Sequence, residues 1–170
     1  NAFVDKFKQK LTTDDCYTPA PVYDAVLDFV RGLTPIQGRE VVRPFYPGGD
    51  YERFDYPAGC VVADNPPFSI VSRIVRWYLG RGVRFFLFAP YLSNVGIGGR
   101  DMRVCHVIAQ WNVRFENGAE VPLSFVTDLD PELVAESAPD LRRLVKEADE
   151  KNRAATKRSL PKYVFPPEVL

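Results

Sequence analysis

Residues 61–64 of this chain read VVAD, and residues 65–68, which follow directly, read NPPF. Proline has no N–H group and a fixed φ, so the carbonyl oxygens of Asn65 and Pro66 meet little local competition for donors. A planar amino group can donate one hydrogen to the Asn65 side chain and the other to a backbone carbonyl, while Phe68 stacks on the attached ring. Such a site polarises an exocyclic amine without a general base.

The residues on either side predict how this segment is held. Residues 61–64 have the character of a buried strand, and Ser69 is placed to cap a helix over residues 70–79. The nearly continuous apolar run 83–90 is typical of a strand buried on both faces of a sheet. Strand, helix and strand then form a βαβ crossover, and Asn65 lies at the carboxyl edge of the sheet, where α/β proteins bind ligands.

Two earlier segments are expected near the same edge. Residues 40–45 read as a short strand, and Gly48 and Gly49 follow it, where paired glycines allow close approach of the backbone to a ligand. Further upstream, Thr18-Pro19 opens an amphipathic helix with the threonine as its expected cap. A common helix start is the plainer interpretation of that dipeptide.

The second half of the chain predicts a hairpin and a basic helix. One strand is predicted over 104–111. Two more, over 113–116 and 119–127, flank Asn117-Gly118, a strong turn signal. Residues 131–160 are expected to be helical with a break near Pro139. Between residues 139 and 162 there are eight Lys or Arg residues and four acids, which favour either phosphate contacts or a solvated helix face.

Composition limits the classes of function. The chain has 22 basic and 22 acidic residues, a balance that argues against a strongly electrostatic nucleic-acid binder. Its 170 residues are expected to form a single domain (1–170), and no apolar run has the length of a membrane span. Three scattered cysteines favour free thiols in a reducing cytoplasm. Cys105-His106 lacks the partners of a zinc site, so no metal is expected.

The order of these motifs resembles the EcoRI-type adenine-specific DNA methyltransferase family. The similarity runs from Cys16 to Thr127, and residues 65–68 are its specific part. It implies a reduced, Rossmann-like α/β methyltransferase sheet, mainly parallel and closed by an antiparallel hairpin. It also implies S-adenosylmethionine as cofactor and an adenine-containing DNA duplex as partner.

The resemblance assigns roles to individual residues. Asn65 and the Pro66 carbonyl bind the adenine N6 amine, Pro67 completes the rigid segment, and Phe68 stacks on a base flipped from the duplex. The residues implied to line the cofactor are Thr18, Pro19, Phe45, Gly48, Gly49, Asp50 and Asp64.

Two departures from the family pattern keep alternatives open. The two glycines are adjacent rather than alternating, and the short segment between Asp50 and Asp64 has no room for the helix and strands that usually carry an acid for the ribose hydroxyls. A methyltransferase-like binding module without catalysis is therefore one alternative. An amino-methyltransferase acting on RNA or on protein glutamine is another. The chain also lacks a separate recognition domain, so specificity is expected from a homodimer or a partner.

Overall fold

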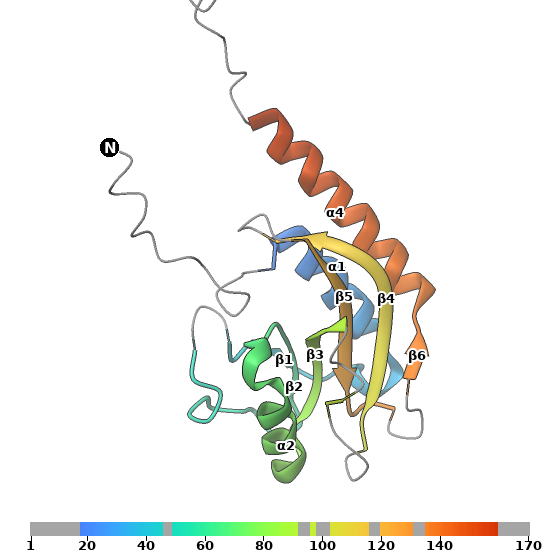
Figure 1. The fold of residues 1–170 in the computed structure, drawn as a ribbon. Coiled ribbons are helices and arrows are strands. Elements are labelled where there is room, and N and C mark those ends of the chain that lie inside the picture. Colours follow the sequence, from blue (N-terminus) through green and yellow to red (C-terminus); the bar gives the residue numbers. More distant parts are fainter. Residues whose placement is uncertain are drawn as a thin grey trace, which may run out of the picture.

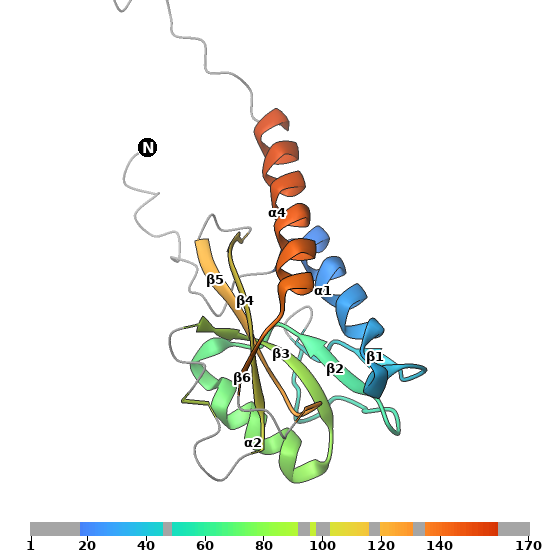
Figure 2. The same cartoon turned by 90° about the vertical axis from the view of Figure 1, so that its right-hand side faces the viewer.

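The computed structural model describes residues 18–45, 49–91, 96–97, 103–115, 120–130 and 135–159. Residues 157–159 are described by their backbone alone. The described part is an α/β fold in which one mixed sheet has helices on both faces (Figures 1 and 2). Its helices are α1 (Ala20–Gly32), α2 (Val71–Arg81) and α4 (Pro139–Ser159), with the 3₁₀ turns η3 (Thr34–Ile36) and η4 (Phe68–Ile70). Its strands are β1 (Val41–Val42), β2 (Val61–Asp64), β3 (Arg84–Pro90), β4 (Cys105–Arg114), β5 (Glu120–Thr127) and β6 (Ala135–Ser137).

The sheet has a parallel part and an antiparallel part. Its strand order is β1-β2-β3-β5-β4-β6. β1, β2 and β3 run parallel, β5 runs antiparallel to both of its neighbours, and β6 runs parallel to β4. The predicted α/β sheet and its closing antiparallel pair of strands are therefore present. The Asn117-Gly118 turn between those two strands lies outside the described residues.

The βαβ crossover predicted around residues 61–90 is confirmed. β2 leads through η4 and α2 into β3, and β2 and β3 pair in parallel. The Ser69 cap is wrong, because α2 begins after Ile70 and no side chain caps it. The helix also continues past residue 79 to Arg81, where Gly82 adopts a φ of 67° and ends it.

The first helix forms where expected but without the expected cap. Val22, Val26 and Val30 are buried on one face of α1. Its N-cap position is Pro19, and no side chain caps the helix. A Thr18 cap is wrong, because the helix begins at Ala20 and Pro19 occupies the N-cap position.

The C-terminal half differs most from expectation. Residues 105–114 form one strand rather than two, because a bulge between Ile108 and Asn112 absorbs the irregularity, with Gln110 at a φ of 52°. Ala135–Ser137, expected to be helical, instead pairs with β4 as the edge strand β6. Pairing with a distant strand decided this conformation, and α4 starts only at Pro139.

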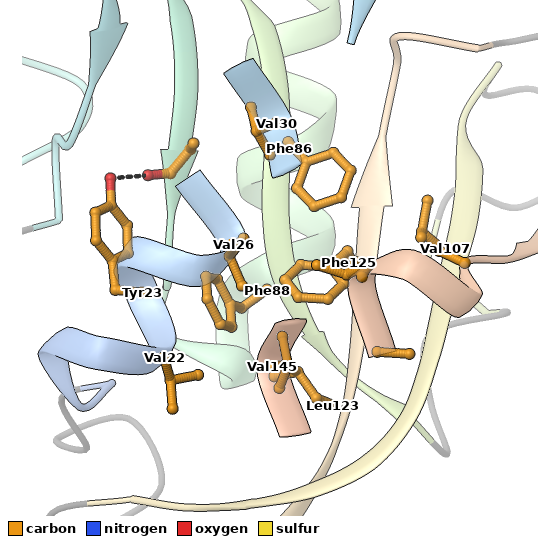
Figure 3. Close-up of a cluster of buried hydrophobic side chains, with 14 of the residues drawn as sticks. Val22, Tyr23, Val26, Val30, Phe86, Phe88, Val107, Leu123, Phe125 and Val145 are labelled. Atoms are coloured by element: carbon orange, nitrogen blue, oxygen red, sulfur yellow. Dashed lines mark hydrogen bonds between the residues drawn. The ribbon is translucent and has the colours of Figure 1, made fainter. Parts of the chain in front are cut away.

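The core has two layers because successive strand residues point to opposite faces of the sheet. Phe86 and Phe88 of β3 contact the layer formed by α1 and α4, whereas Phe85 and Leu87 contact the layer under α2. Figure 3 shows the first layer, in which Phe125 lies between strand and helix residues. No helix among the described residues is both long and apolar enough to cross a bilayer.

Candidate functional site

The segment 65–68 lies at the carboxyl edge of the parallel strands, beside the turn that follows β1. The Asp64 carboxylate connects the two. Its Oδ2 accepts a hydrogen bond from the Phe45 amide at 2.8 Å, and its Oδ1 accepts one from the Asn65 amide at 2.9 Å. Asp64 is only 1% exposed. The two oxygens of one buried carboxylate therefore connect the starts of both loops.

Arg43 and Tyr23 complete this connection. Arg43 Nε donates to Asp64 Oδ1 at 3.3 Å, and its guanidinium lies 3.4 Å from the centre of the Tyr23 ring. The Tyr23 hydroxyl donates to the Ala63 carbonyl at 2.9 Å (Figure 3). Sequence reasoning missed both residues. The only signal was positional, since Tyr23 adjoins the apolar stripe of α1 and Arg43 follows a strand.

Burial changes the proton affinities of two of these groups. It raises the pKa of Asp64, against hydrogen bonds from Phe45 and Asn65 and the charge of Arg43, which lower it. Burial also raises the pKa of Tyr23 to about 12. Tyr23 therefore stays protonated at neutral pH and keeps donating to β2. Both shifts follow from the burial of these two groups beneath the loops.

The four residues 65–68 are less buried than the strand that precedes them. Asn65, Pro67 and Phe68 are half-buried, whereas Pro66 is buried. Phe68 begins η4 and packs against the core layer of α1 and α4. Its ring is therefore held on one side and partly exposed on the other.

Two exposed large hydrophobic residues belong to the same part of the fold. Ile70 is the last residue of η4 and is 37% exposed, and Tyr91 directly follows the carboxyl end of β3 and is 41% exposed. Asn65 follows the carboxyl end of the neighbouring strand. Apolar surface of this kind is available to a flat ring.

The glycine turn after β1 acts differently from the expectation. A Cβ at Gly49 would clash with the backbone carbonyl oxygen of Pro44, so this glycine is required by the turn itself. The neighbouring Asp50 is exposed, and its Oδ1 accepts a hydrogen bond from the Glu52 amide at 2.9 Å. Phe45 is buried, with its ring centre 5.6 Å from that of Tyr51. Gly48 lies outside the described residues.

Thr18 and Pro19 lie at the start of α1, whose first turn reaches β2 through Tyr23. Thr18 is 8% exposed, and its hydroxyl oxygen has no hydrogen-bond partner among the described residues. A buried hydroxyl without a hydrogen bond is unfavourable, so this oxygen keeps the capacity to form one.

The connection from β1 to β2 contains no helix or strand within residues 49–60. Aromatic contacts hold it against α2 instead. Tyr56 donates to the Tyr51 carbonyl at 2.7 Å, and its hydroxyl lies 3.0 Å from that of Tyr78. The sequence-based expectation that this segment has no room for a helix and further strands is confirmed for residues 49–60.

The basic helix is largely neutralised where it is described. Arg153 pairs with both Asp149 and Glu120, at 2.7 and 2.8 Å. The other pairs along α4 are Arg143 with Asp140 and Glu147, and Lys146 with Glu150. These contacts favour the solvated, ion-paired interpretation of α4. The side chains of Lys157 and Arg158, and all of Lys162, lie outside the described residues.

No family model, curated protein or solved structure matches this chain.

Proposed function

We propose that this chain is the catalytic core of an S-adenosylmethionine-dependent methyltransferase that modifies a planar amino group, with the N6 amine of a flipped DNA adenine as its substrate. One observation carries the proposal. Asp64 holds the turn after β1 and the Asn65 segment together at the carboxyl edge of parallel strands. A cofactor loop and an amine-binding segment that begin side by side are what direct methyl transfer between two bound molecules requires.

The chemistry follows from the acceptors of the segment. S-adenosylmethionine supplies an electrophilic methyl group when bound. The Asn65 side-chain oxygen and the Pro66 carbonyl accept the two amine hydrogens, which concentrates electron density on the nitrogen. Transfer would break the bond from methyl to sulfonium sulfur as the C–N bond forms, with the neutral thioether as leaving group. The Asn65 and Pro66 oxygens would stabilise the positive charge on the nitrogen, and one proton would then leave to solvent. Phe68 and Pro67 hold the ring in line.

Two residues fit a cofactor at this edge directly. The Thr18 hydroxyl has no hydrogen-bond partner among the described residues. The Asp50 carboxylate accepts from the Glu52 amide and pairs with Arg53 at 3.5 Å, but it is exposed and keeps lone pairs for ribose hydroxyls. Phe45 is buried, and both carboxylate oxygens of Asp64 already accept hydrogen bonds from the chain. These two residues therefore contribute by shape and position. Asp64 is therefore a positioning residue in this proposal.

DNA is proposed as substrate on the resemblance, and the exposed Ile70 and Tyr91 support a ring-binding rim. Because the described part of α4 is ion-paired, recognition of a DNA sequence falls to a second copy or a separate partner in this proposal. Cys60 and Cys105 are free and buried thiols, in keeping with a proposed cytoplasmic location.

The test is transfer of labelled methyl groups from S-adenosylmethionine to adenine-containing duplexes, with RNA and glutamine peptides as parallel substrates. We expect label in DNA with the wild type and a loss of at least about 100-fold in Asn65→Ala, since one hydrogen-bond acceptor in the transition state is removed. Asn112→Ala, at an exposed asparagine of β4, is the matched control. Equal labelling by wild type and Asn65→Ala contradicts the site.

A catalytically inactive binding module is the second candidate, and the missing helix between β1 and β2 favours it. Calorimetry separates the two. Saturable heat with S-adenosylmethionine that is weakened in Thr18→Val supports the cofactor site. Absence of heat at millimolar cofactor, together with retained binding of DNA, supports the inactive module.

A further inference from the structure

A pocket opens at the end of the sheet opposite Asn65, at the amino ends of β2 and β3. Its volume is about 520 Å³. Since β2 has four residues, this pocket lies on the order of 13 Å from Asn65 along the strand. The pocket is lined by residues that precede β1 and β2 and by the connection from the end of α2 to the start of β3, including Arg39, Gly59, Cys60, Arg81, Gly82 and Arg84.

Three arginines from three separate parts of the fold line this pocket. Arg39 precedes β1, and its Nη1 donates to the Gly59 carbonyl at 3.1 Å. Arg81 ends α2, and its guanidinium lies 4.4 Å from the centre of the Trp77 ring. Arg84 begins β3. A carbonyl contact and a ring contact orient the first two guanidinium groups but leave their charge uncompensated.

The charge of the lining is positive, because no carboxylate is among its residues. Arg84 pairs with Asp128, 2.8 Å away. Neither Arg39 nor Arg81 has an ion-pair partner within the described ranges. Glu40 also lies near the pocket, because its charge adds to the effect of burial in raising the pKa of Cys60. Asp128 and Glu40 are therefore two acids beside three arginines. A cleft lined by one sign of charge concentrates ligands of the other sign.

We propose that this pocket binds a phosphate group. The planar fork of arginine matches phosphate oxygens. Arg39 and Arg81, which have no ion pair among the described residues, supply two such forks from separate elements, while Arg84 stays bound to Asp128. Gly59 and Gly82, with φ of 72° and 67°, line the pocket without side chains and leave its floor open to the anion. The phosphate belongs either to a small molecule or to a nucleic-acid backbone, and both sources share this chemistry.

The experiment measures binding of inorganic pyrophosphate, AMP and a DNA duplex to the full chain at constant ionic strength, without S-adenosylmethionine. The test variant is Arg39→Gln/Arg81→Gln. The matched control is Arg31→Gln/Arg76→Gln, which removes the same charge from exposed arginines outside the pocket. Thermal unfolding shows that each variant is folded before binding is compared.

We expect the test variant to bind about tenfold more weakly or worse, because two charge-assisted hydrogen bonds are removed, whereas the control stays within about twofold. Loss confined to pyrophosphate and AMP identifies a small phosphate ligand. Loss that includes the duplex identifies a backbone phosphate. The proposal is overturned if the wild type binds none of the three probes, or if the test variant binds as well as the control. Neither result depends on methyl transfer.

Discussion

Two buried carboxylates, Asp64 and Asp149, accept similar hydrogen bonds but connect different parts of the molecule. Asp64 binds two backbone amides and Arg43 at the open carboxyl edge. Asp149 accepts from Trp111 Nε1 and the Arg114 amide, both at 3.1 Å, and from Arg153 Nε at 2.7 Å. Asp149 is wholly buried between α4 and the hairpin.

The contrast lies in what each carboxylate connects. Asp149 joins a helix to a strand, two regular elements with large buried surfaces of their own. Asp64 joins two loops, and these loops carry the proposed site. The same chemistry therefore stabilises the fold in one region and positions side chains in the other.

Removing Asp149 is expected to have the largest effect on stability. Asp149→Ala leaves the Trp111 Nε1 and Arg114 amide donors without their acceptor and removes one of the two carboxylates on Arg153, so the free energy of unfolding should fall by about 3 kcal/mol. Urea unfolding followed by circular dichroism measures it. The control is Glu150→Ala, because its exposed carboxylate lies 3.9 Å from Lys146 Nζ and contributes about 0.5 kcal/mol or less. Equal losses in the two variants would contradict the role of Asp149.

Asp64→Asn should cost less but act locally. The carboxamide presents an N–H group to one of the donors now bonded to Asp64, so we expect a loss of about 2 kcal/mol. Hydrogen exchange should show reduced protection of the Phe45 amide, with the Arg114 amide unchanged. If protection at Phe45 persists, Asp64 does not hold the turn after β1.

Gly49 tests the same turn from its backbone. Gly49→Ala places a Cβ against the Pro44 carbonyl and should cost about 1–2 kcal/mol. Gly80→Ala is the matched control, since it lies in α2 with open space around it and should gain about 0.5–1 kcal/mol. The two substitutions differ in sign if the turn is tightly closed, and thermal unfolding measures both.

The smallest effect concerns His106 of β4, the single histidine of the chain. Burial lowers its pKa below the ordinary 6.5, so the unfolded chain binds the proton more tightly than the folded protein. Stability contributed by the neutral ring is present above about pH 6.5 and is lost as the pH falls toward the lowered value. We expect urea unfolding between about pH 7.5 and 5.5 to show this loss in the wild type but not in His106→Gln. Parallel pH profiles would contradict it.

Much of the parallel half was predictable, because its signals are local. The apolar runs at 61–64 and 83–90 and the stripe between them are properties of neighbouring residues, and they specified β2, α2 and β3. Caps were predicted less well. Thr18 and Ser69 have the right chemistry, yet proline geometry and a 3₁₀ turn gave the helices other starts.

The sequence predicted the segment that forms the candidate site but not the distant residues that hold this segment in place. Asn65-Pro66-Pro67-Phe68 was visible because four adjacent residues carry it. The bond from Tyr23 to Ala63 and the stacking of Arg43 on Tyr23 join residues 20 or more positions apart, and no local pattern encodes them.

The sequence alone determined the order of β2, α2 and β3, the carboxamide and prolines after β2, and the absence of a helix from residues 49–60, since each depends on residue type and short spacing. Only the tertiary structure decided that Ala135–Ser137 is an edge strand, that Asp64 faces inward to hold two loops, and that arginines from three parts of the chain line one pocket. The reason is physical: hydrogen bonds and charges between distant residues gain their strength from burial and geometry, which exist only after the chain has folded.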